Sequence, residues 1–368
     1  SDIHLEHERE KVRVRFRIDG TLHPIAILSP EKYRILFSSI ASAANLSTAS
    51  KEAQSGHIVR EMGELRRSFK LVDGRGETVD LSKDPDDHIL NMRIETVPTT
   101  YGQDAVIRLF NFRQDMLKMD VLGLDDSEMA ELKEIVSHPH GMVMVVGPTG
   151  SGKSTTLFSI LNALNDPTRK LITLEDPVEF DIPGVTQIPV DTTHGQSFAD
   201  NVRTILRLDP DVVMVGEIRD VDTAKTAIQA AITGHLLLAT FHAQDAAAAF
   251  ARFVDMIGIN PVFTTAIRVV IGQRLVRRLD PETRIEYEPD EMTKQWIRKT
   301  LADLPPTATK PDLDNIRLWR PGKSASNPFG YKGRTVLMEQ LIMSDEIAKF
   351  ISGEIKDVNA NAIAATAK

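Results

Sequence analysis

Hydrophobic and polar residues alternate strictly in the stretch KVRVRFRIDG, residues 11–20. Valine, phenylalanine and isoleucine occupy the even positions from 12 to 18, and three arginines occupy the odd positions between them. A period of two predicts a half-buried strand with a solvated arginine face, and the strand should end at the Asp19-Gly20 turn.

The segments after this strand favour a small mixed domain. Ser29 before Pro30 is typical of a helix start, with a capping serine followed by a first-turn proline. Further strands are expected in SFKLVD (68–73), NMRIETVP (91–98) and DAVIRLF (104–110). Residues 1–110 are therefore predicted to form an N-terminal α+β domain.

From residue 125 the pattern changes to that of an α/β core. DDSEMAELKEIVSHPHG (125–141) predicts a short amphipathic helix with capping residues at its start and a Pro-x-Gly stop. Four continuous apolar stretches, MVMVV, KLITL, DVVMV and HLLLAT, then alternate with helical segments up to Leu279. Uninterrupted apolar strands are typical of a parallel sheet that is buried on both faces.

The last ninety residues lose this regularity. The segment from Asp280 to Phe329 is polar, rich in proline and aperiodic, and RTVLMEQL (334–341) and SDEIAKFI (344–351) are predicted to be helical. The expected organisation is an N-terminal domain (1–110), a linker (111–125), a P-loop α/β domain (126–280), an insertion (281–330) and C-terminal helices (331–368).

Composition and charge narrow the class of protein. The 368 residues are 42% hydrophobic and 26% charged, which is ordinary for soluble globular chains. No apolar run approaches the roughly 20 residues of a membrane span, and no signal peptide is recognisable. Because the chain starts with Ser1 inside a predicted strand, we expect it to be a piece of a longer protein.

The formal charge of −8 argues against duplex nucleic acid as the main partner, since such binders usually present a basic surface. The absence of cysteine excludes disulfides and any thiolate zinc site, and it fits a reducing compartment.

The stretch GPTGSGKST carries the strongest chemical signal. It matches G-x-x-x-x-G-K-[ST], follows the strand MVMVV and opens the helix TTLFSILNAL. The glycines let backbone N–H groups converge on phosphate, and the helix start adds positive charge. Lys153 should reach the β- and γ-oxygens, and Ser154 should ligate Mg²⁺. The expected nucleotide-binding residues are Gly147, Pro148, Thr149, Gly150, Ser151, Gly152, Lys153, Ser154 and Thr155.

Acidic residues follow two other predicted strands. DPDVVMVGEIRD (209–220) contains Glu217 at a strand end, where a carboxylate beside a P-loop holds the metal or its water. LITLEDPVEF (171–180) places Glu175 and Asp176 at the carboxyl edge of the same sheet, where a carboxylate can take a proton from the attacking water. Glu179 fits an ordinary loop acid equally well.

Two histidines bracket the strand HLLLAT. His242 follows its carboxyl end, where an imidazole could donate to a γ-oxygen, although a lone histidine beside an apolar strand is more often structural. A zinc site shared with His235 is not expected, because residues seven apart across a strand do not converge.

The order of these motifs resembles that of the secretion-ATPase superfamily, the hexameric motors of type II secretion and type IV pilus assembly. In that family the Walker A, Asp, Walker B and His boxes correspond to GPTGSGKST, ITLEDPVEF, DPDVVMVGEIRD and GHLLLATFHAQDA. SDIHLE and RFRIDGTL resemble the start of its second N-terminal domain, and GQRLVRRL and GYKGRTVLMEQ resemble its C-terminal motifs. The resemblance implies a RecA-like core after a small PAS-like α+β domain.

The resemblance also implies roles. Glu175 would be the general base, Glu217 would place Mg²⁺ and water, and His242 rather than His235 would sense the γ-phosphate. Arg93 in MRIETVP and Arg108 in VIRLF match family arginines that reach nucleotide at a boundary between domains or subunits. From the residues alone, both are simply polar positions on strands.

Three departures from the family pattern stand out. QSGH (54–57) replaces the frequent Gln-Asp-Gly-Arg, so that His57 stands where a third arginine is expected. The two cysteine pairs that hold zinc in assembly motors are missing, although an insertion of about fifty residues remains between RLVRRL and GYKGR. Ala243 replaces the usual threonine, and the chain ends at Lys368, earlier than the family's C-terminal helices commonly do.

The expected function is a ring-forming motor that uses ATP and Mg²⁺, without zinc, for type IV pilus assembly or type II secretion. A homo-hexamer would act on a membrane-embedded platform protein from the cytoplasmic face of the inner membrane. Pilus retraction is the alternative within the superfamily, although retraction motors have a much shorter connection in place of the insertion. A RecA-like nucleic-acid motor and a nucleotide-binding scaffold without turnover are the alternatives from other classes.

Overall fold

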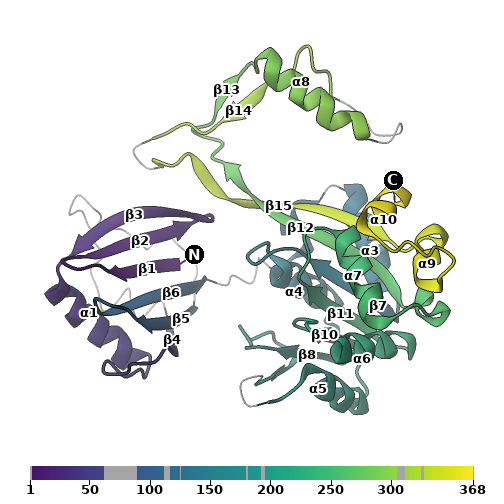
Figure 1. The fold of residues 1–368 in the computed structure, drawn as a ribbon, viewed down its shortest axis with the longest axis horizontal. Coiled ribbons are helices and arrows are strands. Elements are labelled where there is room, and N and C mark those ends of the chain that lie inside the picture. The colour runs from purple at the N-terminus through teal and green to yellow at the C-terminus, as the bar shows by residue number, and fades with distance from the viewer. Residues whose placement is uncertain are drawn as a thin grey trace. The chain divides into compact units, whose positions relative to one another are not determined.

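The computed structural model describes residues 2–61, 89–111, 117–124, 126–179, 181–191, 195–304, 311–324 and 327–367. The chain forms two compact units, Ser1–Gln114 and Asp115–Lys368. Figure 1 labels their helices and strands, and each unit is described by itself.

The first unit is built on a six-stranded antiparallel sheet with the order β3-β2-β1-β6-β5-β4. The alternating arginine segment forms β2, as predicted, and the turn after it has positive φ at Asp19 and Gly20. The predicted strand at 68–73 lies outside the described residues. The strands are β1 (Asp2–His7), β2 (Val12–Ile18), β3 (Thr21–Leu28), β4 (Gln54–Glu61), β5 (Ile89–Pro98) and β6 (Gln103–Asn111).

Helix α1 (Pro30–Ala43) covers one face of this sheet. The hydroxyl of Ser29 accepts a hydrogen bond from the Lys32 backbone N–H at 3.4 Å, so the predicted cap is confirmed. Tyr33, Phe37 and Ala41 of the helix pack with apolar side chains of the strands in a buried cluster. The arginines of β2 point to the opposite face, because side chains alternate along a strand.

The second unit contains a seven-stranded sheet with the order β15-β12-β7-β11-β10-β8-β9. All strands except β15 run parallel, and every residue of β7, β8, β10 and β11 is buried. The predicted α/β core is therefore confirmed. Its parallel strands are β7 (Gly141–Val146), β8 (Leu171–Glu175), β9 (Thr186–Pro189), β10 (Val212–Val215), β11 (Leu236–Phe241) and β12 (Ile267–Leu279).

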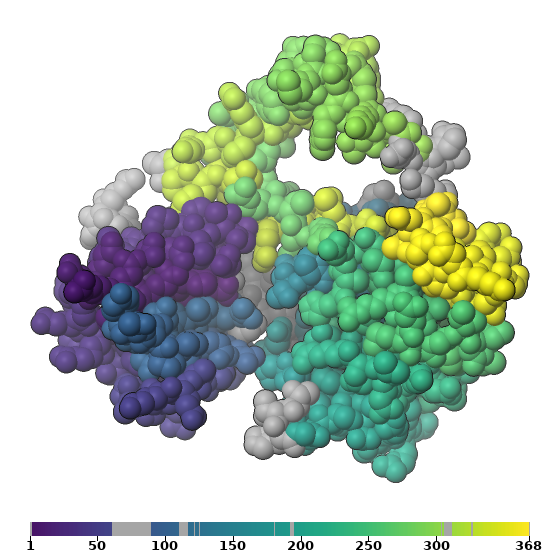
Figure 2. All heavy atoms as spheres, viewed as in Figure 1, coloured from purple at the N-terminus to yellow at the C-terminus, as the bar shows by residue number. Residues whose placement is uncertain are grey.

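Helices flank this sheet (Figure 1). Helices α5, α6 and α7 share one buried apolar cluster with the strands, while α4 packs against β7 and β11 with apolar residues outside that cluster. Helices α9 and α10, yellow in Figure 2, contact each other at the surface. The helices are α3 (Asp126–Ser137), α4 (Lys153–Leu164), α5 (Phe198–Ile205), α6 (Val221–Ile232), α7 (Ala246–Ile257), α9 (Asp345–Ser352) and α10 (Ala360–Thr366).

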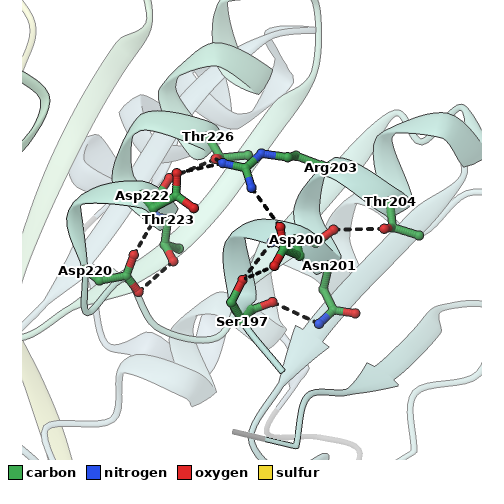
Figure 3. Close-up of polar contacts among 9 residues, drawn as sticks. All are labelled: Ser197, Asp200, Asn201, Arg203, Thr204, Asp220, Asp222, Thr223 and Thr226. Atoms are coloured by element: carbon green, nitrogen blue, oxygen red, sulfur yellow. Dashed lines mark hydrogen bonds and ion pairs between the residues drawn. The ribbon is translucent and has the colours of Figure 1, made fainter. Parts of the chain in front are cut away.

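Polar contacts join α5 to α6 close to the Walker B segment (Figure 3). The Arg203 guanidinium donates to Asp200 on its own helix at 2.8 Å and to Asp222 on α6 at 2.6 Å. Asp220 caps α6 by accepting hydrogen bonds from the backbone N–H and hydroxyl of Thr223. These contacts fix the start of α6, four residues after Glu217.

The prediction that RTVLMEQL is helical is wrong. These residues lie in β15 (Tyr331–Ile342), which pairs antiparallel with β12 along nearly its whole length. A short apolar stretch is compatible with both the helical and the strand period. Here the long partner strand β12 pairs with the backbone N–H and C=O groups of the segment, so it forms a strand. The C-terminal part therefore begins with a strand, whereas SDEIAKFI forms the predicted helix, α9, and the structure shows Ser344 as its cap.

The insertion contains more regular structure than its aperiodic sequence indicates. Strands β13 (Ile285–Tyr287) and β14 (Leu318–Arg320) pair antiparallel, and α8 (Glu291–Thr300) lies between them in sequence. The Arg284 guanidinium stacks over the Trp319 ring at 4.2 Å, whereas Trp296 is 66% exposed. The described residues of the insertion are thus joined by a small ladder and by cation–π contacts.

Candidate active site

The phosphate-binding loop lies between β7 and α4, at the carboxyl end of β7. Gly147, Gly150 and Gly152 all have positive φ, and a Cβ at Gly147 would come within 2.5 Å of the Gln273 carbonyl oxygen. The loop conformation therefore requires glycine at that position. Gly152 precedes the first residue of α4, so the loop leads directly into the start of a helix, a favourable place for a phosphate.

Lys153 is held against the loop carbonyls. Its Nζ donates hydrogen bonds to the carbonyl oxygen of Gly147 at 2.9 Å and to that of Pro148 at 3.2 Å. Burial lowers the pKa of Lys153 from its ordinary value, and the nearby Glu217 carboxylate partly opposes this shift. A phosphate offers the ammonium group stronger acceptors than two neutral carbonyls do.

Gln273 on β12 forms hydrogen bonds to the phosphate-binding loop and to α4. The side chain is 3% exposed, its Nε2 donates to the Ser151 carbonyl oxygen at 2.7 Å, and its Oε1 accepts from the Thr156 hydroxyl at 2.8 Å. This residue ties the loop to the first turn of α4. Sequence reasoning missed it, although a glutamine among the apolar residues of a buried strand was the available signal.

Glu175 ends β8 and is 4% exposed. Its Oε1 accepts hydrogen bonds from the Thr173 hydroxyl at 2.5 Å and from the Gln187 side-chain amide at 2.9 Å. Burial raises the pKa of Glu175 above the ordinary glutamate value, while these two hydrogen bonds and the Glu179 backbone N–H act in the opposite direction. A buried carboxylate with a raised pKa suits a general base.

Glu217 lies just beyond β10, and its carboxylate contacts two side chains, Arg219 and His242. The Arg219 guanidinium donates to Oε2 at 2.7 Å, and His242 Nε2 lies 3.2 Å from Oε1. Arg219 also approaches the Asp176 carboxylate at 3.7 Å. The structure thus places His242 beside the Walker B acid. Sequence reasoning missed Arg219, which stands two residues after Glu217 in the quoted GEIRD.

His235 lies at the opposite end of β11 from His242. Its Nδ1 is 3.1 Å from the carbonyl oxygen of Ala230 and 3.4 Å from the Thr233 hydroxyl, and its own carbonyl accepts from the Gly141 N–H. Gly141 begins β7, whereas the phosphate-binding loop follows the other end of that strand. His235 therefore stands at the edge of the sheet away from the loop.

The side chains expected to hold magnesium fit that ion. Ser154 is an exposed residue in the first turn of α4, and Glu217 supplies carboxylate oxygens just after β10. Hydroxyl and carboxylate oxygens, together with phosphate oxygens and water, are the ligands that Mg²⁺ takes in nucleotide sites. The assignment of the ion to these two residues stays a prediction.

Arg93 and Arg108 belong to the first unit and are direct cross-strand neighbours on β5 and β6. Arg93 pairs with Glu95 at 2.6 Å and Arg108 with Asp2 at 3.2 Å. His57 lies opposite Arg93 on β4, so it joins the same row of side chains. That these residues reach a nucleotide stays a prediction.

Several known proteins resemble this chain over most of its length. Residues 76–368 match the family model described as type II/IV secretion system protein. The type IV pilus assembly ATPase PilB of Thermus thermophilus is 37% identical over 97% of this chain. Type II secretion system protein E of Xanthomonas campestris pv. campestris is 35% identical over 95% of it. The chain spans only 38% and 57% of the lengths of these two relatives.

Solved structures support the fold. The pilus retraction motor PilT with bound ADP has 25% identity and a TM-score of 0.58, covering 96% of this chain and 82% of that one. The DotB ATPase of Legionella pneumophila has 22% identity and a TM-score of 0.61, covering 100% and 82%. The predicted RecA-like core and the predicted superfamily are confirmed by these similarities.

Proposed function

Because the chain belongs to the type II/IV secretion system protein family, we propose that it is a motor ATPase that drives type IV pilus assembly or type II secretion. The observation that carries this proposal is the convergence of three groups at one edge of the parallel sheet. The phosphate-binding loop follows β7, Glu175 ends β8 and Glu217 follows β10. The carboxyl edge of such a sheet is where α/β proteins bind their ligands.

Each side chain of the site has its own role in ATP hydrolysis. The Lys153 ammonium group exchanges its hydrogen bonds to the loop carbonyls for hydrogen bonds to the β- and γ-phosphate oxygens. The loop N–H groups bind the β-phosphate. Glu175 accepts the proton of the attacking water, which its buried carboxylate can do in the ionised form. Glu217 and Ser154 would hold a Mg²⁺ ion, which would neutralise charge on the phosphates. His242 donates to a γ-oxygen once nucleotide fills the site.

The insertion favours assembly or secretion over retraction. It is present as a folded element with β13, β14 and α8, whereas retraction motors of the superfamily have a much shorter connection at this place. We infer that the chain forms a homo-hexamer in which ATP hydrolysis moves the first unit against the second. The motion would pass to a platform protein at the cytoplasmic face of the inner membrane. Among the helices of the described residues, none is both long and apolar enough to cross a bilayer.

Pilus retraction is the second candidate function, because the retraction motor PilT resembles the chain over 96% of its length. A nucleic-acid motor is less favoured, since the net charge of −8 offers little attraction to phosphate backbones. Deleting the gene separates the first two functions: loss of pili or secreted protein supports assembly, and an excess of pili that no longer retract supports retraction.

A nucleotide-binding and turnover assay of the purified chain tests the ATPase. We expect Mg²⁺-dependent release of phosphate from ATP. Lys153→Ala should weaken ATP affinity by about ten-fold or more, because charge-assisted hydrogen bonds to phosphate are lost. Lys170→Ala, remote from the loop in sequence and exposed, is the matched control and should bind ATP normally. If Lys153→Ala binds ATP as tightly as wild type, the nucleotide does not occupy this loop.

The insertion should function without zinc. Among residues that the structure describes, no three histidine or acidic side chains gather into a group that could hold a metal ion. A structural zinc ion contributes directly to folding free energy where one is bound. We therefore expect metal analysis to find no stoichiometric zinc and a chelator to leave the melting temperature unchanged. One zinc per chain would contradict this prediction.

A further inference from the structure

Glu175 is hydrogen-bonded by two side chains, Thr173 within the ITLEDPVEF stretch and Gln187 outside all of the quoted motifs. Thr173 lies two residues before it on β8, so both side chains point to the same face of the strand. Gln187 on the edge strand β9 stands directly opposite Thr173 in the parallel register. Three polar side chains, Thr173, Glu175 and Gln187, therefore meet on one face of the adjacent strands β8 and β9.

The donor and the acceptor of each hydrogen bond in this group follow from the contacts of Gln187. The backbone N–H of Ile182 donates to Gln187 Oε1 at 2.7 Å, which leaves the amide Nε2 to donate to Glu175 Oε1 at 2.9 Å. The Thr173 hydroxyl donates to the same carboxylate oxygen at 2.5 Å. Both side chains thus donate to the same oxygen, and the Glu179 backbone N–H is a third donor to the carboxylate.

We propose that Gln187 and Thr173 are positioning residues that hold Glu175 as an ionised base for the attacking water. This inference rests on the proposed ATPase function and deepens it. A buried carboxylate needs donors to remain ionised, and two charge-assisted hydrogen bonds to one oxygen also fix the rotation of the carboxyl group. The amide orientation set by Ile182 makes Gln187 a donor rather than an acceptor at this site.

Further charged or titratable groups follow the carboxyl ends of β8, β10 and β11 or begin α4. Asp176 and Glu179 lie in the loop after β8, Glu217 with Arg219 and His242 follow β10 and β11, and Lys153 begins α4. The pKa of Glu175 responds to burial and to the hydrogen bonds from Thr173, Gln187 and Glu179, in that order. The two side-chain donors are therefore the contacts whose removal should change the proton affinity of the base.

The test is the pH dependence of steady-state ATP hydrolysis in the full chain. Turnover requires ionised Glu175, so it falls as the pH drops through the pKa of that group. Gln187→Met keeps the length of the side chain but removes the donor, so the pKa of Glu175 should rise and the acid limb of kcat should move to higher pH. Near neutral pH we expect kcat to fall about ten-fold, the loss from one hydrogen bond to a charged group. KM for ATP and the affinity for ADP should not change.

Two further variants sharpen the comparison. Gln187→Glu preserves shape but sets a second carboxylate against Glu175, and two such groups share a proton, so the acid limb should move further than in Gln187→Met. Thr173→Val removes the hydroxyl donor and should shift the limb in the same direction. Thr186→Val is the matched control, because Thr186 is an exposed neighbour on β9 with its side chain on the other face, and its profile should match wild type.

The outcomes separate the inference from the function on which it rests. An acid limb that stays in place in both Gln187→Met and Thr173→Val, with kcat lowered equally at every pH, means that the two residues only support the sheet and overturns the inference. If Glu175→Gln retains full turnover, the base itself is elsewhere and the proposed mechanism fails first. Melting curves identify any variant that does not fold. The pH profile of the other donor variant, Gln187→Met or Thr173→Val, then tests the inference.

Discussion

Glu175→Gln should lower ATP hydrolysis by ~10²–10⁴-fold, the range for the loss of a general base. The substitution preserves the size of the side chain, and an amide can still accept from Thr173 through its oxygen. It cannot take a proton from water. ATP and ADP should bind with nearly normal affinity, because the phosphates are held by the loop N–H groups and Lys153, which this change does not touch.

Single-turnover measurements give the sharpest test of this prediction. Wild-type protein should hydrolyse bound ATP, whereas Glu175→Gln should retain it. Glu179→Gln is the matched control, since Glu179 lies four residues away in the loop after β8 and donates to Glu175 through its backbone N–H, which the substitution keeps. Undiminished hydrolysis in Glu175→Gln would move the base elsewhere, and Glu217 would be the next residue to test.

His242→Ala should reduce turnover roughly 10–150-fold, the effect of losing one hydrogen bond to a charged group in the transition state. Besides the expected contact with the γ-phosphate, His242 has a contact in the structure: its Nε2 lies 3.2 Å from the Glu217 carboxylate. The imidazole can therefore hold the metal-binding acid before ATP arrives and donate to a γ-oxygen afterwards. ADP has no γ-phosphate, so its affinity should hardly change.

Parallel measurements on His235→Ala distinguish this role from a structural one. His235 contacts Ala230 and Thr233 at the far end of β11, so its loss should affect local stability more than the hydrolytic step. His242→Gln keeps a donor near the position of Nε2 and should recover part of the lost rate. If His242→Ala weakens ATP and ADP binding equally, the residue supports the fold and does not sense the γ-phosphate.

Local sequence patterns were sufficient for most elements of the core. Strands β7, β8, β10 and β11 are continuous apolar stretches bounded by turn residues, and burial on both faces is the only environment that suits them. The phosphate-binding loop was equally clear, because its glycines and Lys153 have a fixed spacing between strand and helix. Where local signals were ambiguous, as in RTVLMEQL, pairing with the distant β12 decided the outcome.

The sequence by itself determined the chemistry-bearing residues, and the tertiary structure decided what surrounds each of them. Glu175, Glu217 and His242 were predicted because they follow buried strands, a property of neighbouring residues along the chain. Gln187 contacts Glu175 across strands, Arg219 contacts Glu217 around a loop, and Gln273 contacts the phosphate-binding loop from β12. The contact between Gln273 and Thr156 joins residues that are 117 positions apart. Such contacts depend on strand order and register, which the packing of the whole sheet sets and no local pattern records.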